Sequence, residues 1–156
     1  MKNRIAVFPG SFSPFTLGHK SIIDKTLPLF DEIIISIGIN TKKEEYININ
    51  KRIECINDIY NEIDKVKVVK YTGLTIDHCR KTGANFIIRG IRNSNDYLYE
   101  RDICITNKKL NDEIETIFII SDPELSHISS SIVREIMNNA GDLSEFVPKE
   151  IITKLI

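Results

Sequence analysis

The chain has 156 residues, of which 42% are hydrophobic and 28% are charged. This composition predicts a globular protein and excludes a disordered one, and the length suits one domain over residues 1–156 with a single core. The formal net charge of −1 argues against a protein whose main partner is nucleic acid, although a local basic pocket is compatible with it.

Strand-like and helix-like runs alternate along the whole chain. The first strand is expected at Ile5–Phe8, which is bounded by Pro-Gly, and the first helix from Gly18 to Phe30. Further strands are expected at 31–39, 66–71, 85–90 and 115–120, and further helices at 49–60, 74–82, 94–110, 129–140 and 148–155. This alternation predicts an α/β fold, a Rossmann-like doubly wound sheet of five parallel strands with helices on both faces.

The three cysteines, Cys55, Cys79 and Cys104, match neither a zinc pattern nor a CxxC redox pair. Each lies in a helix-like segment among apolar residues, so we expect reduced thiols in or near the core. The N-terminal residues lack the apolar region of a signal peptide, and no apolar stretch approaches transmembrane length. We therefore expect a cytoplasmic protein without a membrane partner.

Polar and cationic residues follow the points where the strands are expected to end. Ligands of open parallel sheets bind at the carboxyl ends of the strands. The residues found there are Gly10, Ser11, His19, Asn40, Lys42, Lys43, Thr72–Thr75, Arg89, Arg92 and the segment 126–131. Most of them are cations or hydrogen-bond donors, so this edge favours an anion with several phosphates.

The loop after the first strand has the features of a phosphate-binding turn. Gly10 allows close backbone approach, Gly18 leaves space beside the helix start, and His19 falls in the first helical turn, where backbone amides favour phosphate. The loop contains neither GxxxxGK[ST] nor GxGxxG. On its own, the loop is equally compatible with a tight turn whose histidine caps or packs.

Two motifs and a central segment resemble the nucleotidyltransferase superfamily. The (T/H)xGH motif appears as Thr16-Leu17-Gly18-His19, and ISSSxxR as residues 128–134. Within the superfamily, "IIRGIRNSNDYLYE" at 87–100 resembles the bacterial phosphopantetheine adenylyltransferase family, and the likeness covers essentially the whole chain. It implies transfer of the adenylyl group of ATP to 4′-phosphopantetheine, which gives dephospho-coenzyme A and pyrophosphate by direct in-line attack without a covalent enzyme intermediate.

The resemblance also implies roles for individual residues. The catalytic positions are His19, Lys43 and Ser11, and the positions that contact the acceptor are Ser11, Lys43, Thr75 and Arg89. The ATP-binding positions are Ser11, Phe12, His19, Gly90, Ile91, Arg92, Glu100, Leu125, Ser126, His127, Ile128, Ser129, Ser130 and Ser131. Lys42 adjoins Lys43, which leaves the lysine open by one position. Ser13 stands where an acidic residue is frequent in the family, and no role is carried onto it.

Each of these residues also has a purely structural explanation. Arg89 and Arg92 could be surface charges, Glu100 a solvated helix residue, and the serines 129–131 a helix N-cap. His78 is expected on a helix surface. Tyr97 and Tyr99 are expected to pack within a helix.

The resemblance implies further partners. Mg²⁺ is expected to bridge ATP oxygens and to keep several waters, without a carboxylate cage. A homohexamer is implied, with the helices after the third and fourth strands as contacts, and coenzyme A is implied as a feedback inhibitor. Two alternatives remain, namely a nucleotidyltransferase acting on another acceptor, such as nicotinate mononucleotide or glycerol phosphate, and a non-catalytic ATP-binding module.

Overall fold

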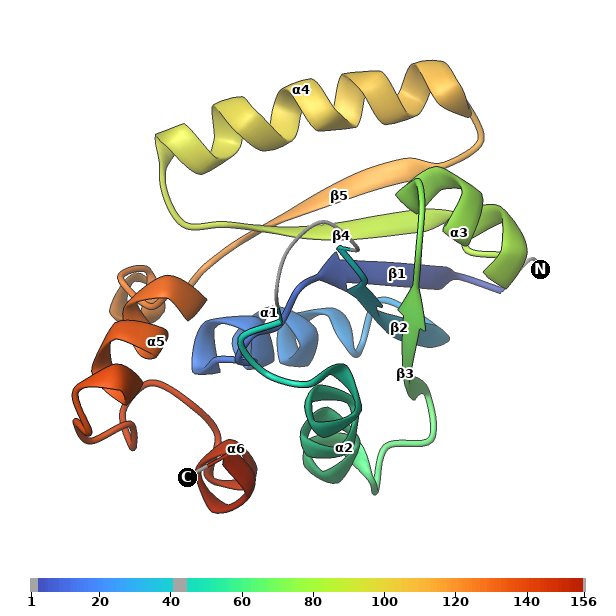
Figure 1. Cartoon of the computed structure of the whole chain (residues 1–156). Coiled ribbons are helices and arrows are strands. Elements are labelled where there is room, and N and C mark those ends of the chain that lie inside the picture. Colours follow the sequence, from blue (N-terminus) through green and yellow to red (C-terminus); the bar gives the residue numbers. More distant parts are fainter. Residues whose placement is uncertain (1–2, 41–44, 156) are drawn as a thin grey trace.

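The structure is a computed structural model that describes residues 3–40 and 45–155, and its centre is one parallel sheet with strand order β3-β2-β1-β4-β5 (Figure 1). The strands are β1 (Ile5–Gly10), β2 (Glu32–Gly38), β3 (Val66–Tyr71), β4 (Phe86–Ile91) and β5 (Glu115–Ile120). The helices are α1 (Leu17–Thr26), α2 (Ile49–Tyr60), α3 (Thr75–Thr82), α4 (Ser94–Leu110), α5 (Ser130–Asn138) and α6 (Lys149–Leu155). The predicted Rossmann-like α/β fold is confirmed, and a short 3₁₀ helix, η1 (Pro123–Leu125), is an element that the sequence did not predict.

Helices cover both faces of the sheet because the strands are apolar on both sides. In β1, Ala6 and Phe8 belong to a core shared with α1, α2, α5 and α6, whereas Val7 belongs to a second core shared with α3. Neighbouring residues of a strand point to opposite faces, so one apolar run supplies both cores. Figure 1 shows α3 and α4 on one side of the sheet and the other four helices on the opposite side.

The order in which strands are added to the sheet changes direction between β1 and β4, and the pairing of these two parallel strands is short. From β1 the chain moves outward through β2 to β3, and it then returns to place β4 on the other side of β1. The pairing of β1 with β2 runs as far as Gly10, whereas its pairing with β4 ends at Val7 and Ile87. The carboxyl ends of β1 and β4 therefore form the switch point at which ligands of such sheets bind.

Two expectations about single residues were wrong. His78 is buried rather than on a helix surface, because its Nε2 lies 2.8 Å from Ser36 Oγ and its ring stacks on Tyr71 at 4.4 Å between centroids. Tyr97 and Tyr99 are exposed, and the Tyr97 ring makes an edge contact with Phe118. In α4 the one buried side chain among the described residues is instead Glu100.

The expectation about the cysteines holds, since all three are free, Cys55 and Cys79 are buried and Cys104 is partly buried. Across residues 3–40 and 45–155, no helix combines the length and the apolar character needed to cross a membrane.

Candidate active site

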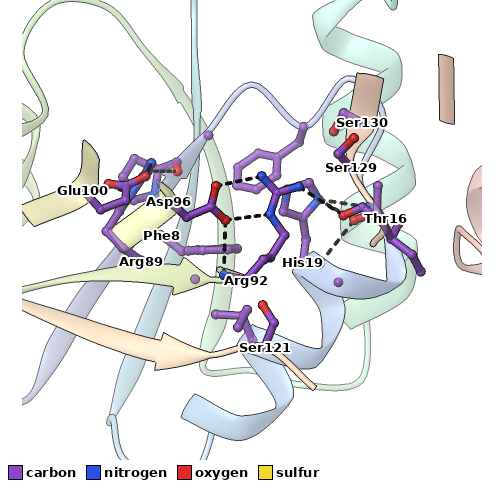
Figure 2. A pocket seen from close by; sticks show the side chains of 17 residues that line it. Phe8, Thr16, His19, Arg89, Arg92, Asp96, Glu100, Ser121, Ser129 and Ser130 are labelled. Atoms are coloured by element: carbon purple, nitrogen blue, oxygen red, sulfur yellow. Dashed lines mark hydrogen bonds and ion pairs between the residues drawn. The ribbon is translucent and has the colours of Figure 1, made fainter. Parts of the chain in front are cut away.

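A cavity of about 270 Å³ opens at the switch point between β1 and β4 (Figure 2). Nine of the predicted site residues line it, namely Phe12, His19, Arg89, Gly90, Arg92, Glu100, Ile128, Ser129 and Ser130. Seven others that the structure describes lie outside its lining, namely Ser11, Thr75, Ile91, Leu125, Ser126, His127 and Ser131. The loop after β1, the end of β4 and the start of α5 thus meet around one space.

His19 is held by the residue that caps its own helix. Thr16 is the N-cap of α1; its side chain accepts a hydrogen bond from the His19 N–H at 3.3 Å, and its own backbone N–H donates to His19 Nδ1 at 3.0 Å. An Nδ1 atom that accepts a hydrogen bond carries no proton, so a neutral His19 bears its proton on Nε2. The capping alternative is therefore correct, and the same contact fixes the ring that lines the cavity.

The charge state of His19 follows from its surroundings. Burial, followed by the positive charges of Arg92 and Arg89, lowers the pKa of His19 from 6.5 to about 4. Near pH 7 the imidazole is neutral, and its Nε2–H is a hydrogen-bond donor. The imidazole is surrounded by aromatic rings, with those of Phe12 and Phe15 at 5.1 and 5.4 Å between centroids.

Arg89 bridges the gap between β4 and β1. Its Nη1 donates to Pro9 O at 2.8 Å, its Nε donates to Glu100 Oε2 at 2.7 Å, and its Nη2 pairs with Glu100 Oε1. Glu100 is buried, so its carboxylate serves to hold the guanidinium. Neither residue is the surface charge that the structural alternative expected.

Arg92 is paired in the same way by a residue that the sequence did not single out. Its Nε and Nη2 donate to Asp96 at 2.8 and 3.1 Å, and Figure 2 shows this pair beside His19. Hydrogen bonds from Arg92 hold the pKa of the Asp96 carboxyl below its usual range. The i,i+4 spacing of Arg92 and Asp96 was the signal available in the sequence.

Ser129 and Ser130, at the start of α5, cap this helix and attach it to the loop after β1. Ser129 is the N-cap and its hydroxyl accepts from the Ile132 N–H at 3.2 Å, as the capping alternative predicted. Ser130 Oγ donates to Pro14 O at 2.8 Å, which ties the start of α5 to the loop after β1. Since Ser129 and Ser130 also line the cavity, the N-terminus of α5 is at its wall.

Gly10, the last residue of β1, and Gly18, in the first turn of α1, have different roles. A Cβ on Gly10 would lie 2.8 Å from Phe12 Cζ, so the close approach made possible by Gly10 is that of the Phe12 ring. A Cβ on Gly18 would meet no atom closer than Thr16 Oγ1 at 3.5 Å, which is an ordinary contact distance. The position beside Gly18 therefore has room for a methyl group at ordinary contact distances, and Gly18 itself lines the cavity.

A second cavity, of about 180 Å³, adjoins the first and shares Pro9, Gly10, Arg89 and Glu100 with it. Thr75 lines this second cavity, and its hydroxyl lies 3.0 Å from the Tyr71 hydroxyl. Cys104 and Asn107 of α4 form part of the opposite wall. Arg89 thus lines both cavities.

Lys43, like Lys42, lies outside the described residues.

The sequence and the fold both have known relatives. A family model described as cytidylyltransferase-like matches residues 7–136. Phosphopantetheine adenylyltransferases from Flavobacterium psychrophilum and Bacteroides fragilis are 48% and 47% identical to the chain, over 97% and 94% of it and over 99% and 97% of their own lengths. A crystal structure described as a nicotinate-nucleotide adenylyltransferase from Vibrio parahaemolyticus superposes with a TM-score of 0.75 over 99% of each chain. At 18% identity, this last likeness concerns the fold alone.

The fold and the cavity are thus those of a nucleotidyltransferase, and the chain belongs to the cytidylyltransferase-like family. Within that class, its full-length relatives show that it belongs to the phosphopantetheine adenylyltransferases.

Proposed function

We propose that this chain transfers the adenylyl group of ATP to 4′-phosphopantetheine, which yields dephospho-coenzyme A and pyrophosphate in coenzyme A biosynthesis. The observation that carries the proposal is the pair of adjoining cavities with Arg89 between them. A transfer between two phosphorylated substrates needs two sites whose phosphates meet, and a cation at the meeting point lowers the repulsion between them.

In the proposed reaction, a phosphate oxygen of the acceptor attacks the α-phosphorus of ATP. The bond between the α- and β-phosphates breaks, and its electrons leave with pyrophosphate. The attacking oxygen is already anionic, so no protein base is required, and catalysis comes from positioning and from stabilising charge. The neutral His19 donates its Nε2–H to an α-phosphate oxygen, and Arg92 with the α5 N-terminus holds the β- and γ-phosphates. Arg89, with Ser11, Lys43 and Thr75, holds the acceptor.

Mg²⁺ is proposed to enter with ATP. Within residues 3–40 and 45–155, no group of three or more His, Cys, Asp and Glu side chains could hold a metal. The two cavity carboxylates, Asp96 and Glu100, are each paired with an arginine. Such a donor set would fit an ion that is held mainly by the substrate rather than by protein carboxylates, and that would supply positive charge beside the phosphates of ATP.

The release of pyrophosphate tests the proposal. Protein, ATP and Mg²⁺ are incubated with 4′-phosphopantetheine, nicotinate mononucleotide or glycerol 3-phosphate, or with no acceptor. We expect pyrophosphate only with 4′-phosphopantetheine, in amounts equal to dephospho-coenzyme A. Release with another acceptor would identify a different nucleotidyltransferase, and binding of ATP without release under any condition would indicate a non-catalytic module.

We further propose that the chain works in the cytoplasm as a homohexamer, and that coenzyme A inhibits it by competing through its pantetheine part. Exposed apolar residues on α4, which include Leu98, Tyr99 and Ile105, support an assembly that uses this helix. Sedimentation velocity should give about six times the 17.9 kDa mass of the chain, and a monomer would contradict the assembly.

A further inference from the structure

Arg52 is a buried cation that the sequence did not single out. It lies on α2, its side chain is 6% exposed, and it lines neither cavity. Its Nη1 donates to Ser11 O at 2.6 Å, and its Nη2 donates to Glu45 Oε1 at 2.7 Å. The guanidinium therefore fastens the loop after β1 to α2.

Burying this group is costly, which calls for an explanation. Within the part of the chain that the structure describes, Arg52 Nε is a buried nitrogen without a hydrogen-bond partner. Glu45, its ion-pair partner, is about one-third exposed, so the pair lies at the boundary of the core. An apolar residue would fill such a position at lower cost, so stability alone does not explain Arg52.

The bond from Arg52 sets the direction of a backbone donor. The peptide between Ser11 and Phe12 is trans, and in a trans peptide the C=O and the N–H point in opposite directions. Because the Ser11 carbonyl points to α2, the Phe12 N–H points away from α2. Phe12 lines the first cavity and no residue of α2 does. Among the described residues, the Phe12 N–H has no protein acceptor.

The conformation of Phe12 shows that this arrangement is imposed. Its φ is +46°, in the left-handed region that a bulky residue seldom adopts. The ring is buried against Phe8 and Phe15, at 5.4 and 5.5 Å between centroids, which holds the side-chain end of the residue. Arg52 holds the peptide on its N-terminal side. Such strain persists only where the surroundings fix it from several sides, and it is common at ligand sites.

We propose that Arg52 is a positioning residue for the transfer reaction, and that it acts by holding the Ser11–Phe12 peptide so that the Phe12 N–H donates to a phosphate oxygen of ATP. Arg52 itself contacts no substrate. The expected changes in kcat rest on the proposed function. The orientation of the Phe12 amide does not, because it is tested by the binding of ATP alone.

The test compares Arg52→Met, which keeps the apolar stem and removes the donors, with Lys51→Met, the same change at the exposed neighbour on α2. With Arg52→Met, kcat should fall on the order of 10²-fold, as for the loss of a preorganised donor, while KM for 4′-phosphopantetheine changes less than threefold and circular dichroism is unchanged. Lys51→Met should behave as wild type. A kcat for Arg52→Met within twofold of wild type would overturn the proposal.

The amide itself is followed in protein labelled with ¹⁵N-phenylalanine, titrated with ATP without acceptor. The Phe12 amide resonance should shift downfield in wild type and Lys51→Met, and should shift little in Arg52→Met. No response in wild type, or an equal response in Arg52→Met, would refute the proposed role.

If Arg52→Met does not fold, Arg52→Lys replaces it, because an ammonium keeps the charge without the planar fork. The kcat of Arg52→Lys should fall on the order of tenfold, and a kcat equal to that of wild type would contradict the proposed role of Arg52. A wild type that transfers no adenylyl group would refute the proposed function alone.

Discussion

At the scale of single residues, the first cavity places two arginines beside a histidine whose pKa is about 4. Arg89 and Arg92 each have a carboxylate partner from α4, which holds their guanidinium groups in fixed orientations. The same two positive charges disfavour a second proton on His19. The site therefore combines fixed cations with a neutral donor, an arrangement suited to an anion whose charge shifts during reaction.

The first prediction concerns the protonation of His19. In a ¹H–¹³C NMR titration, its Cε1–H resonance should stay constant from pH 8 to about 5.5 and should titrate near pH 4. In the unfolded chain His19 titrates near 6.5, so between about 6.5 and 4 the unfolded state binds the extra proton. The contribution of His19 to the free energy of unfolding should therefore decrease as the pH falls through this range. A native midpoint near 6.5 would contradict the neutral-donor role.

A second prediction concerns Glu100, whose buried carboxylate holds Arg89. Glu100→Gln keeps the shape but removes the charge-assisted pair, so Arg89 should lose its fixed orientation. We expect kcat/KM for 4′-phosphopantetheine to fall on the order of tenfold, since hydrogen bonds to charged groups contribute about 1.5–3 kcal/mol. Asp102→Asn, an exposed carboxylate on the same helix, is the control. Equal rates for both variants would show that Glu100 does not position Arg89.

At the scale of elements, the junction between β1 and α1 determines the shape of the site. The Phe12 ring packs over Gly10, Thr16 caps α1, and Ser130 ties α5 to Pro14. The loop is therefore fixed on several sides before any ligand arrives. The glycines on either side of the loop differ in their surroundings, because a Cβ on Gly10 would clash with the packed Phe12 ring, whereas a Cβ on Gly18 would make only ordinary contacts beside the cavity.

A third prediction follows from these glycines. Gly10→Ala should lower the free energy of unfolding by about 1–3 kcal/mol, since the new methyl group overpacks against Phe12. Gly18→Ala should leave stability equal or raise it by up to about 1 kcal/mol, because alanine favours the helix, and should weaken ATP binding by narrowing the cavity. Urea unfolding and calorimetric titration measure the two effects. Equal stability losses in both variants would contradict the assigned roles.

At the scale of the whole molecule, the sheet and much of the site could be predicted from the sequence. Alternating apolar runs specify the five strands, and residues after them gather at one edge because parallel strands end there. Contacts between distant residues could not be predicted in this way. The Arg52–Ser11 bond and the burial of His78 against Ser36 each join residues about 40 positions apart. Local patterns do not specify such partners, since they depend on how helices pack on the sheet.

In the proposed function, adenylyl transfer takes place in the cavity around His19. The most direct measurement is the rate of dephospho-coenzyme A formation by wild type and by His19→Ala, with folding checked by circular dichroism. We predict that the wild type forms the product from ATP and 4′-phosphopantetheine, and that kcat of the variant falls on the order of 10²-fold or more. A folded His19→Ala protein with the turnover of wild type would contradict the assignment of adenylyl transfer to this cavity.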